Sequence, residues 1–184
     1  MEMAFIALSK YEITDMVETL SATLAVIVGV ATLIIVVGWL TGQDSVLNAV
    51  REFRATITLC VAGGAMLGSL YFSEVANYIP CRFCWFQRIA MYPIAIIGLV
   101  SFIRRDTAGR FYVLPIAGIG ACISAWHYLI EWRPALDTGS CAATGPSCTD
   151  IWFRSFGFLT LAGMALIGFI TLIVVNAIPE RAEE

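Results

Sequence analysis

The strongest constraint on the fold is a set of five apolar segments, each long enough to cross a membrane. They cover residues 17–40, 56–76, 85–103, 112–132 and 155–178. A helix needs about 20 apolar residues to cross roughly 30 Å of hydrocarbon. The chain is 59% hydrophobic and 14% charged, unlike a soluble domain. We therefore predict an all-α integral membrane protein with five transmembrane helices, in which residues 1–184 form a single membrane domain.

The first segment, residues 17–40, has two readings: a retained helix or the apolar core of a cleaved signal sequence. A signal sequence carries a positively charged region before a shorter apolar core. Here the preceding residues include Glu2, Glu12 and Asp15 against a single Lys10. We therefore expect a retained transmembrane helix.

Basic residues are distributed unevenly between the connections, and cytoplasmic loops are usually richer in Lys and Arg. The connections after the first and third segments and the C-terminal tail contain Arg51, Arg54, Arg104, Arg105, Arg110 and Arg181. The other face has Lys10, Arg82, Arg133 and Arg154, accompanied by many acidic residues. This bias predicts a multi-pass protein of the cell membrane with its N-terminus outside and its C-terminus in the cytoplasm. The net charge of −3 gives no basic surface for nucleic acid.

Four of the six cysteines lie in connections that reach the same face of the membrane. Cys81 and Cys84 lie between the second and third segments, and Cys141 and Cys148 lie between the fourth and fifth. Two crossings separate the pairs, so they share one face whichever face is outside. The arginine bias makes it the extracytoplasmic face, where disulfides persist. The pairs are therefore placed to exchange with one another and with an extracytoplasmic partner.

The first pair forms a Cys-x-x-C motif at the expected start of a helix, where the helix N-terminus and a nearby Arg stabilise a thiolate. Arg88 lies four residues after Cys84, on the same helix face and about 6 Å deeper. An arginine at mid-bilayer costs on the order of 3 kcal/mol, so Arg88 either snorkels to the surface or serves a thiolate or polar ligand. The only histidine, His127, lies roughly 7 Å below the same surface, where it either bonds to a neighbour or handles protons or a ligand.

The second pair lies in a loop rich in Pro, Gly, Ser and Thr, which is typical of an exposed segment. Cys141 and Cys148 enclose only six residues, so a bond between them would stabilise the fold by about 2 to 3 kcal/mol at most. Such a disulfide is better suited to exchange with a soluble thiol.

Small residues inside the apolar segments are expected to serve packing. Gly64 and Gly68 form a G-x-x-x-G pattern that suits close contact between helices. The remaining cysteines, Cys60 and Cys122, lie within apolar segments, and we expect them to be buried as small hydrophobes.

Three stretches taken together, CRFCWFQRIAMYP, AWHYLIEW and CAATGPSC, resemble the DsbB family of disulfide-bond formation proteins, in particular its short-loop, Bacillus-type branch. The resemblance covers residues 56–178 and implies a DsbB-like four-helix bundle there, with residues 17–40 as an extra N-terminal helix. It also implies an enzyme, a protein-disulfide:quinone oxidoreductase. Such an enzyme reoxidises a soluble, DsbA-like thioredoxin-fold protein and passes the electrons to a membrane quinone of the ubiquinone or menaquinone type.

Carried over residue by residue, the resemblance implies that the soluble partner attacks Cys141. Cys148 would then pair with Cys81 and leave Cys84 as the thiolate next to the quinone. Arg88 and His127 match family residues near the quinone, and no metal is expected.

Besides a membrane scaffold whose disulfides are inert, two alternatives remain open at this point. One is a vitamin K epoxide reductase-like quinone reductase, although in that group the loop pair precedes the C-x-x-C motif. The other is a structural four-cysteine zinc site joining the two loops, which has the right number of ligands but lies on an oxidising face.

Overall fold

The computed structural model describes residues 2–137, 139, 141 and 145–180, with side chains from residue 11 onward. Arg181 of the expected cytoplasmic tail lies outside these residues. The helices of the described chain are α1 (Glu2–Leu40), α2 (Asp44–Leu70), α3 (Arg82–Arg104), α4 (Arg110–Trp132) and α5 (Leu161–Ala177). A π-helical turn, η1 (Tyr71–Val75), continues α2, and a 3-10 turn, η2 (Pro134–Leu136), follows α4.

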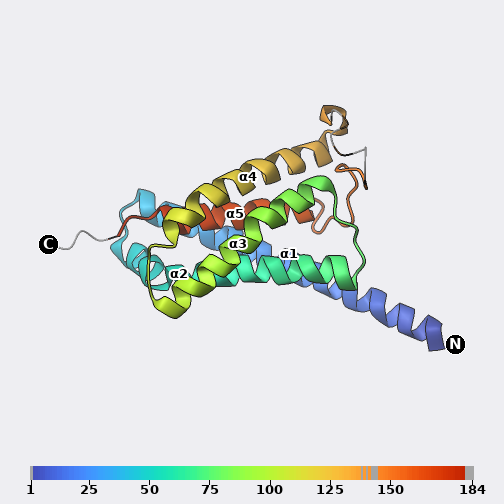
Figure 1. Ribbon diagram of the computed structural model, residues 1–184, viewed down its shortest axis with the longest axis horizontal. Coiled ribbons are helices and arrows are strands. Elements are labelled where there is room, and N and C mark those ends of the chain that lie inside the picture. Colours follow the sequence, from blue (N-terminus) through green and yellow to red (C-terminus); the bar gives the residue numbers. More distant parts are fainter. Residues whose placement is uncertain (1, 138, 140, 142–144, 181–184) are drawn as a thin grey trace.

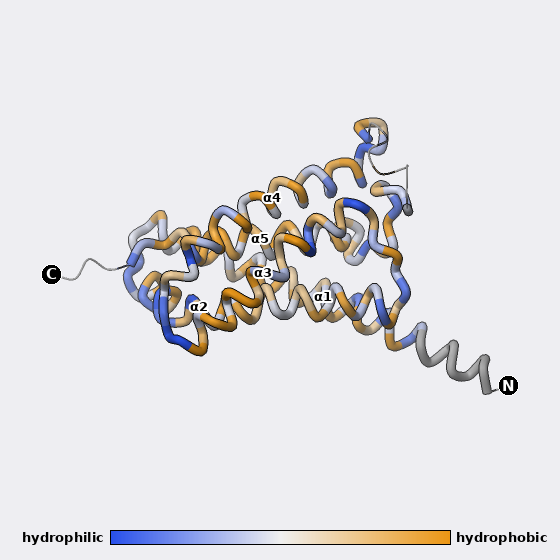
Figure 2. The backbone as a smooth tube through the Cα atoms, in the orientation of Figure 1, coloured by the Kyte–Doolittle hydropathy of each residue, from blue (hydrophilic) through white to orange (hydrophobic). Residues whose placement is uncertain are grey.

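These helices form one elongated bundle, as Figure 1 shows. α1 to α4 are long and apolar enough to cross a membrane, and α5 is a shorter apolar helix of 17 residues. That length is at the lower limit of the range of about 17 to 25 residues for a spanning helix. Hydrophilic residues gather toward the two ends of the bundle and hydrophobic ones between them (Figure 2). The prediction of an all-α membrane protein is confirmed.

Three helices begin well away from the start of their apolar segments, and the first is α1, which begins at Glu2 instead of near residue 17. α2 begins at Asp44, well before residue 56, because Arg51, Glu52 and Arg54 interrupt hydropathy without interrupting a helix. α5 begins at Leu161 because the chain first closes a turn, in which the Ser155 and Leu159 backbones are hydrogen-bonded at 2.9 Å.

The main core lies between α2, α3, α4 and α5. Its buried members are Ala62, Ala90, Met91, Ile94, Ala95, Val113, Ala117, Phe169 and Leu172. Small residues bring the helices close together: a Cβ on Gly120 of α4 would overlap the ring of Phe169 on α5. The core therefore holds α3 and α4 in place, and these two helices carry Cys84 and His127.

α1 packs on the outside of this core, where its contacts with other helices are to α2 and α5. The hydroxyls of Thr32 and Thr171, both buried, are hydrogen-bonded at 2.8 Å and join α1 to α5. Nearer the cysteine end, the Tyr78 hydroxyl donates a hydrogen bond to the Glu18 carboxylate. Burial and this bond raise the pKa of Tyr78 above its usual value. These two hydrogen bonds attach α1 to the bundle at its middle and near the cysteine end.

Two expectations about small residues are wrong. Cys60 and Cys122 are exposed instead of buried, and Cys60 lines a cavity together with Gly64 and Gly68 of the same helix. A Cβ on Gly64 or Gly68 would meet no atom within 4 Å, because both glycines face a cavity instead of a helix.

Candidate functional site

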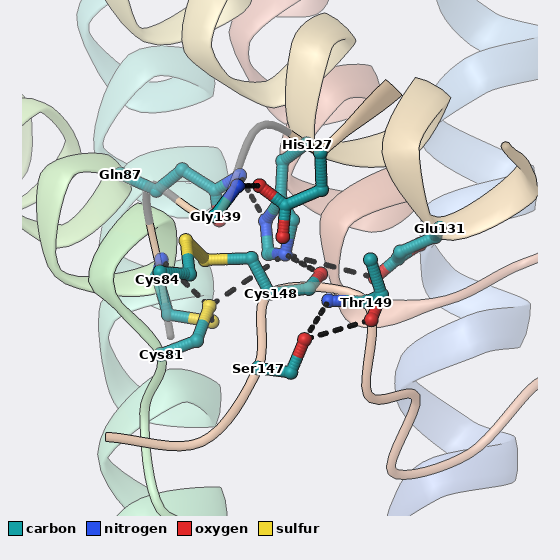
Figure 3. The surroundings of a disulfide bond; sticks show 11 residues. Cys81, Cys84, Gln87, His127, Glu131, Gly139, Ser147, Cys148 and Thr149 are labelled. Atoms are coloured by element: carbon teal, nitrogen blue, oxygen red, sulfur yellow. Dashed lines mark hydrogen bonds and ion pairs between the residues drawn. A yellow bond between two sulfur atoms is a disulfide. The ribbon is translucent and has the colours of Figure 1, made fainter. Parts of the chain in front are cut away.

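The structure brings all four loop cysteines to one end of the bundle. Cys81, Cys141 and Cys148 share a buried cluster with Ile130, and Cys84 packs against it. Cys141 and Cys148 are joined by a disulfide, whereas Cys81 and Cys84 are free thiols with their Sγ atoms 2.8 Å apart. Figure 3 shows the loop disulfide beside these two thiols, with His127 above them. Two pairs far apart in sequence thus form a single sulfur site.

The Cys-x-x-C motif straddles the start of α3, as the sequence predicts. Cys81 is the residue before the helix, and its Sγ accepts a hydrogen bond from the backbone N–H of Cys84 at 3.3 Å. A sulfur held at a helix N-terminus is stabilised as a thiolate by the N–H groups that point toward it.

Several groups lower the pKa of Cys81 below its usual value. The largest effect is the hydrogen bond from the Cys84 thiol, followed by the contact with His127, while burial of the sulfur acts in the opposite direction. The net direction makes Cys81 the thiolate of the reduced pair.

His127 is held at the sulfur site by contacts to both of its ring nitrogens. Its Nε2 lies 3.6 Å from Cys81 Sγ and 3.2 Å from the Cys148 carbonyl oxygen. Its Nδ1 lies 3.1 Å from Nε2 of Gln87. When the Gln87 amide donates to Nδ1, the ring proton sits on Nε2, where it faces the sulfur and the loop carbonyl. The ring therefore links α3, α4 and the second loop.

The sequence reasoning missed three polar residues that support this ring. Gln87 is one, and Glu131 lies 3.9 Å from His127 Nε2. The side chain of Glu131 is buried and accepts a hydrogen bond of 2.6 Å from the Thr160 hydroxyl at the start of α5. One signal was present in the sequence: Glu131 follows His127 by four residues, so both lie on one face of α4.

A small pocket surrounds Cys81 and His127. Beyond it, a second cavity of about 460 Å³ opens between α1, α2, α3 and α5 and begins at Cys84. Its lining is mostly apolar, with Gln87, Arg88, Tyr92 and Ser69 among the polar exceptions. Gly64 and Gly68 widen it from α2, and α1 contributes Ser21, Leu24, Ala25 and Val28. Such a space suits a flat, hydrophobic ligand with a few polar atoms.

Arg88 faces this cavity and is anchored beside it. Its guanidinium donates a hydrogen bond of 3.0 Å to the Ser69 carbonyl and lies 5.3 Å from the centre of the Trp85 ring. Cys84 lines both this cavity and the small pocket around Cys81 and His127. His127 lines only the small pocket, so the structure separates it from Arg88.

The metal-ligating groups differ from those of a four-cysteine zinc site. Cys141 and Cys148 are bonded to each other, which removes their thiolates as ligands. Within the described residues, the group that could hold an ion is Cys81, Cys84 and His127, whose ligand atoms lie within 4.8 Å of one another.

Comparison with known proteins adds independent support for a role in disulfide bond formation. The family model described as "Disulfide bond formation protein DsbB" matches residues 51–178. The "Probable disulfide formation protein C 1" of Bacillus anthracis is 42% identical over 132 residues, which is 70% of this chain and 95% of the relative. The "Disulfide bond formation protein C" of Bacillus subtilis is 46% identical over 110 residues, 60% of this chain and 80% of the relative. No solved structure matches the chain.

The matched range begins within α2, so α1 lies outside it. The range contains both cysteine pairs, with the C-x-x-C motif first, and favours this family over the vitamin K epoxide reductase-like group. The chain therefore belongs to the DsbB family and is a multi-pass membrane protein of disulfide bond formation.

Proposed function

We propose that this protein is a protein-disulfide:quinone oxidoreductase that reoxidises a soluble, DsbA-like thioredoxin-fold partner. The observation that carries the proposal is the position of Cys84. It contacts Cys81 on one side, within the sulfur cluster, and on the other side it opens onto an apolar cavity that also holds Arg88. A dithiol at such a boundary is suited to pass electrons from the loop disulfide to a ligand in the membrane.

The thiol chemistry follows from the four cysteines. A partner thiolate attacks Cys141, breaks its bond to Cys148 and forms a mixed disulfide. The Cys148 thiolate attacks Cys81 of an oxidised Cys81–Cys84 pair and releases the Cys84 thiolate. The second partner thiol resolves the mixed disulfide, and the freed Cys141 thiolate attacks Cys148, which restores the loop disulfide and releases Cys81.

These steps leave the partner oxidised, the loop pair bonded and Cys81 and Cys84 reduced, which is the arrangement in this structure. Re-forming the Cys81–Cys84 disulfide releases two electrons and two protons. A bound quinone supplies the acceptor for both, so partner dithiol plus quinone becomes partner disulfide plus quinol.

The residues around the second cavity fit a quinone. Arg88 would donate a hydrogen bond to a ring oxygen beside Cys84, and the apolar walls would hold an isoprenoid tail. His127, whose protonated Nε2 faces Cys81, would stabilise its thiolate by donating a hydrogen bond to the sulfur. We also propose that the cysteine end is extracytoplasmic, where a soluble partner and an oxidising environment meet.

The test measures quinone reduction by the purified protein, with a reduced thioredoxin-fold protein as the electron donor. The absorbance of a short-chain ubiquinone or menaquinone analogue reports the reaction. We expect turnover in the wild type, its loss in Cys84→Ala, and a rise of at least about tenfold in the KM for quinone in Arg88→Gln, since one charge-assisted hydrogen bond is lost. Arg133→Gln, an exposed arginine outside both cavities, is the control. Wild-type protein that does not reduce either quinone would contradict the proposal.

Trapping tests the order of the thiol steps. In Cys148→Ala the loop disulfide cannot form, so Cys141 is a free thiol. When the partner's own second cysteine is also replaced, a mild oxidant such as diamide takes the two electrons and joins Cys141 to the remaining partner thiol. The adduct is expected to persist, because neither the loop nor the partner keeps a second thiol to break it. Non-reducing gels of a strain that carries both variants measure the adduct. The same experiment with Cys141→Ala should give no adduct through the loop, and equal adducts in both variants would refute the assignment.

A further inference from the structure

A third cavity, of about 740 Å³, lies at the end of the bundle opposite the cysteines. It is enclosed by the first half of α2, the end of α3, the connection to α4, the first turn of α4 and Asn176 near the end of α5. In Figure 1 these segments meet at the end of the bundle near the C-terminus. The thiol chemistry uses none of its residues.

The cavity has an excess of positive charge. Four arginines line it: Arg51, Arg54, Arg105 and Arg110. Its acidic lining residues are Glu52 and Asp106, and Asp106 is already paired with Arg104, which lies outside the cavity, at 3.4 Å. Glu180 neutralises part of the positive charge of these arginines, because its carboxylate pairs with Arg54 and lies 3.9 Å from Arg110.

The donors of these arginines are incompletely used. Arg54 is 3% exposed, and its Nε is buried without a hydrogen-bond partner among the described residues. Arg51 donates to the Pro179 carbonyl and the Asn48 side chain, neither of which carries charge. No carboxylate within the described residues pairs with Arg51 or Arg105. An arginine fork without a carboxylate is a strong donor for a phosphate group.

The cavity is also amphipathic. Buried Thr58, Ser101 and Asn176 form a polar wall, and Ile97, Phe102 and Val113 form an apolar one. These apolar residues belong to spanning helices, so the cationic opening lies where lipid headgroups meet acyl chains.

We propose that this cavity binds a phosphate-bearing anion, and that the apolar wall selects the phosphodiester headgroup of an anionic lipid. Arg51 and Arg105 supply charge that no carboxylate of the described residues pairs with, and the apolar wall receives the start of an acyl chain. The site is independent of the cysteine chemistry and would hold the membrane end of α2 and the α3–α4 connection in place.

The experiment measures lipid binding to the detergent-purified full chain by native mass spectrometry, with phosphatidylglycerol and phosphatidylcholine as probes. We expect tight binding of phosphatidylglycerol only, weakened about fivefold in Arg105→Gln and about 25-fold in the double variant Arg51→Gln, Arg105→Gln. Arg133→Gln removes the same charge at the cysteine end and should bind like the wild type. Because Arg105 is exposed, the single variant tests the site even if the double variant does not fold.

Inorganic phosphate alone, measured by the shift in thermal midpoint, distinguishes the two sources of a phosphate group. A shift that depends on Arg105, without preferential binding of phosphatidylglycerol, would support the anion site and overturn the lipid assignment. Equal binding of both lipids together with no phosphate shift, or equal losses in Arg105→Gln and Arg133→Gln, would overturn the proposal as a whole.

Discussion

At the scale of single residues, the surroundings of Cys81 decide the chemistry of the reduced pair. The motif predicts a thiolate stabilised by a helix N-terminus and an arginine. The structure confirms the position of Cys81 at the helix N-terminus, but the side chains that contact its Sγ are the Cys84 thiol and His127 instead of an arginine. Arg88 faces the cavity beyond Cys84. Each side of the pair is thus served by a different basic residue.

The low pKa of Cys81 leads to a prediction about pH. A depressed pKa means that the Cys81 thiolate persists below pH 8.5, the usual thiol midpoint, and is lost only when the pH falls through the lowered value. His127→Ala removes one stabilising contact, so the midpoint should rise by about one unit. Thiolate absorbance at 240 nm, titrated on the reduced protein in a Cys60→Ala, Cys122→Ala background, measures it. A wild-type midpoint at the ordinary value would contradict the assignment.

At the scale of helices, α1 has the most distinctive position. It lies outside the range that matches the family, yet it forms one wall of the cavity that begins at Cys84. It is fixed to the core through Thr32 and to the cysteine end through Glu18. Under the proposed function, α1 shields a bound quinone from the surrounding lipid.

This position of α1 predicts different effects for two similar substitutions. Ala25 lines the cavity, and Ile27 is 58% exposed on the outer face of the same helix. Ala25→Trp should fill part of the cavity and raise the KM for a quinone analogue about tenfold, while adduct formation with the soluble partner is unchanged. Ile27→Trp should alter neither. Equal KM values in the two variants would show that α1 does not line the quinone site, and the assignment of the thiol steps would be unaffected.

The contact between α4 and α5 gives a second prediction at this scale. Ala at position 120 would overlap the buried ring of Phe169, so Gly120→Ala should reduce stability by about 1 to 3 kcal/mol. A Cβ on Gly118, two residues earlier in α4, would meet no atom within 4 Å. Gly118→Ala should therefore be neutral or stabilise the helix by up to about 1 kcal/mol. Denaturation in detergent, compared between the two variants, measures the difference.

At the scale of the whole molecule, the two ends of the bundle differ in chemistry. One end has the sulfur site and buried Glu131, and the other has the cavity with four arginines. Cytoplasmic ends of membrane proteins are the more basic ones. The difference in charge between the two ends therefore agrees with a cytoplasmic location of the arginine end, which stays a prediction. The division of the chain into an extra N-terminal helix and a four-helix core also stays a prediction.

Reporter fusions test this orientation. Green fluorescent protein fused after Glu184 should fluoresce in bacterial cells, and alkaline phosphatase at the same position should be inactive, because the C-terminus is expected in the cytoplasm. Fusions truncated after Asp137, in the connection that bears the second cysteine pair, should give the opposite result. Active phosphatase at the C-terminus would invert the proposed orientation.

Hydropathy and the order of the segments alone were sufficient for the membrane class, the order of the five apolar helices and the placement of both cysteine pairs at one end. These properties depend on segment length and on the number of crossings, which are local or purely topological. The packed structure decided how each helix is rotated about its axis. That rotation directs Gly64 and Gly68 into a cavity, separates Arg88 from His127, and brings Gln87 and Glu131 to the imidazole. It depends on contacts between residues far apart in the chain, which no single apolar segment records.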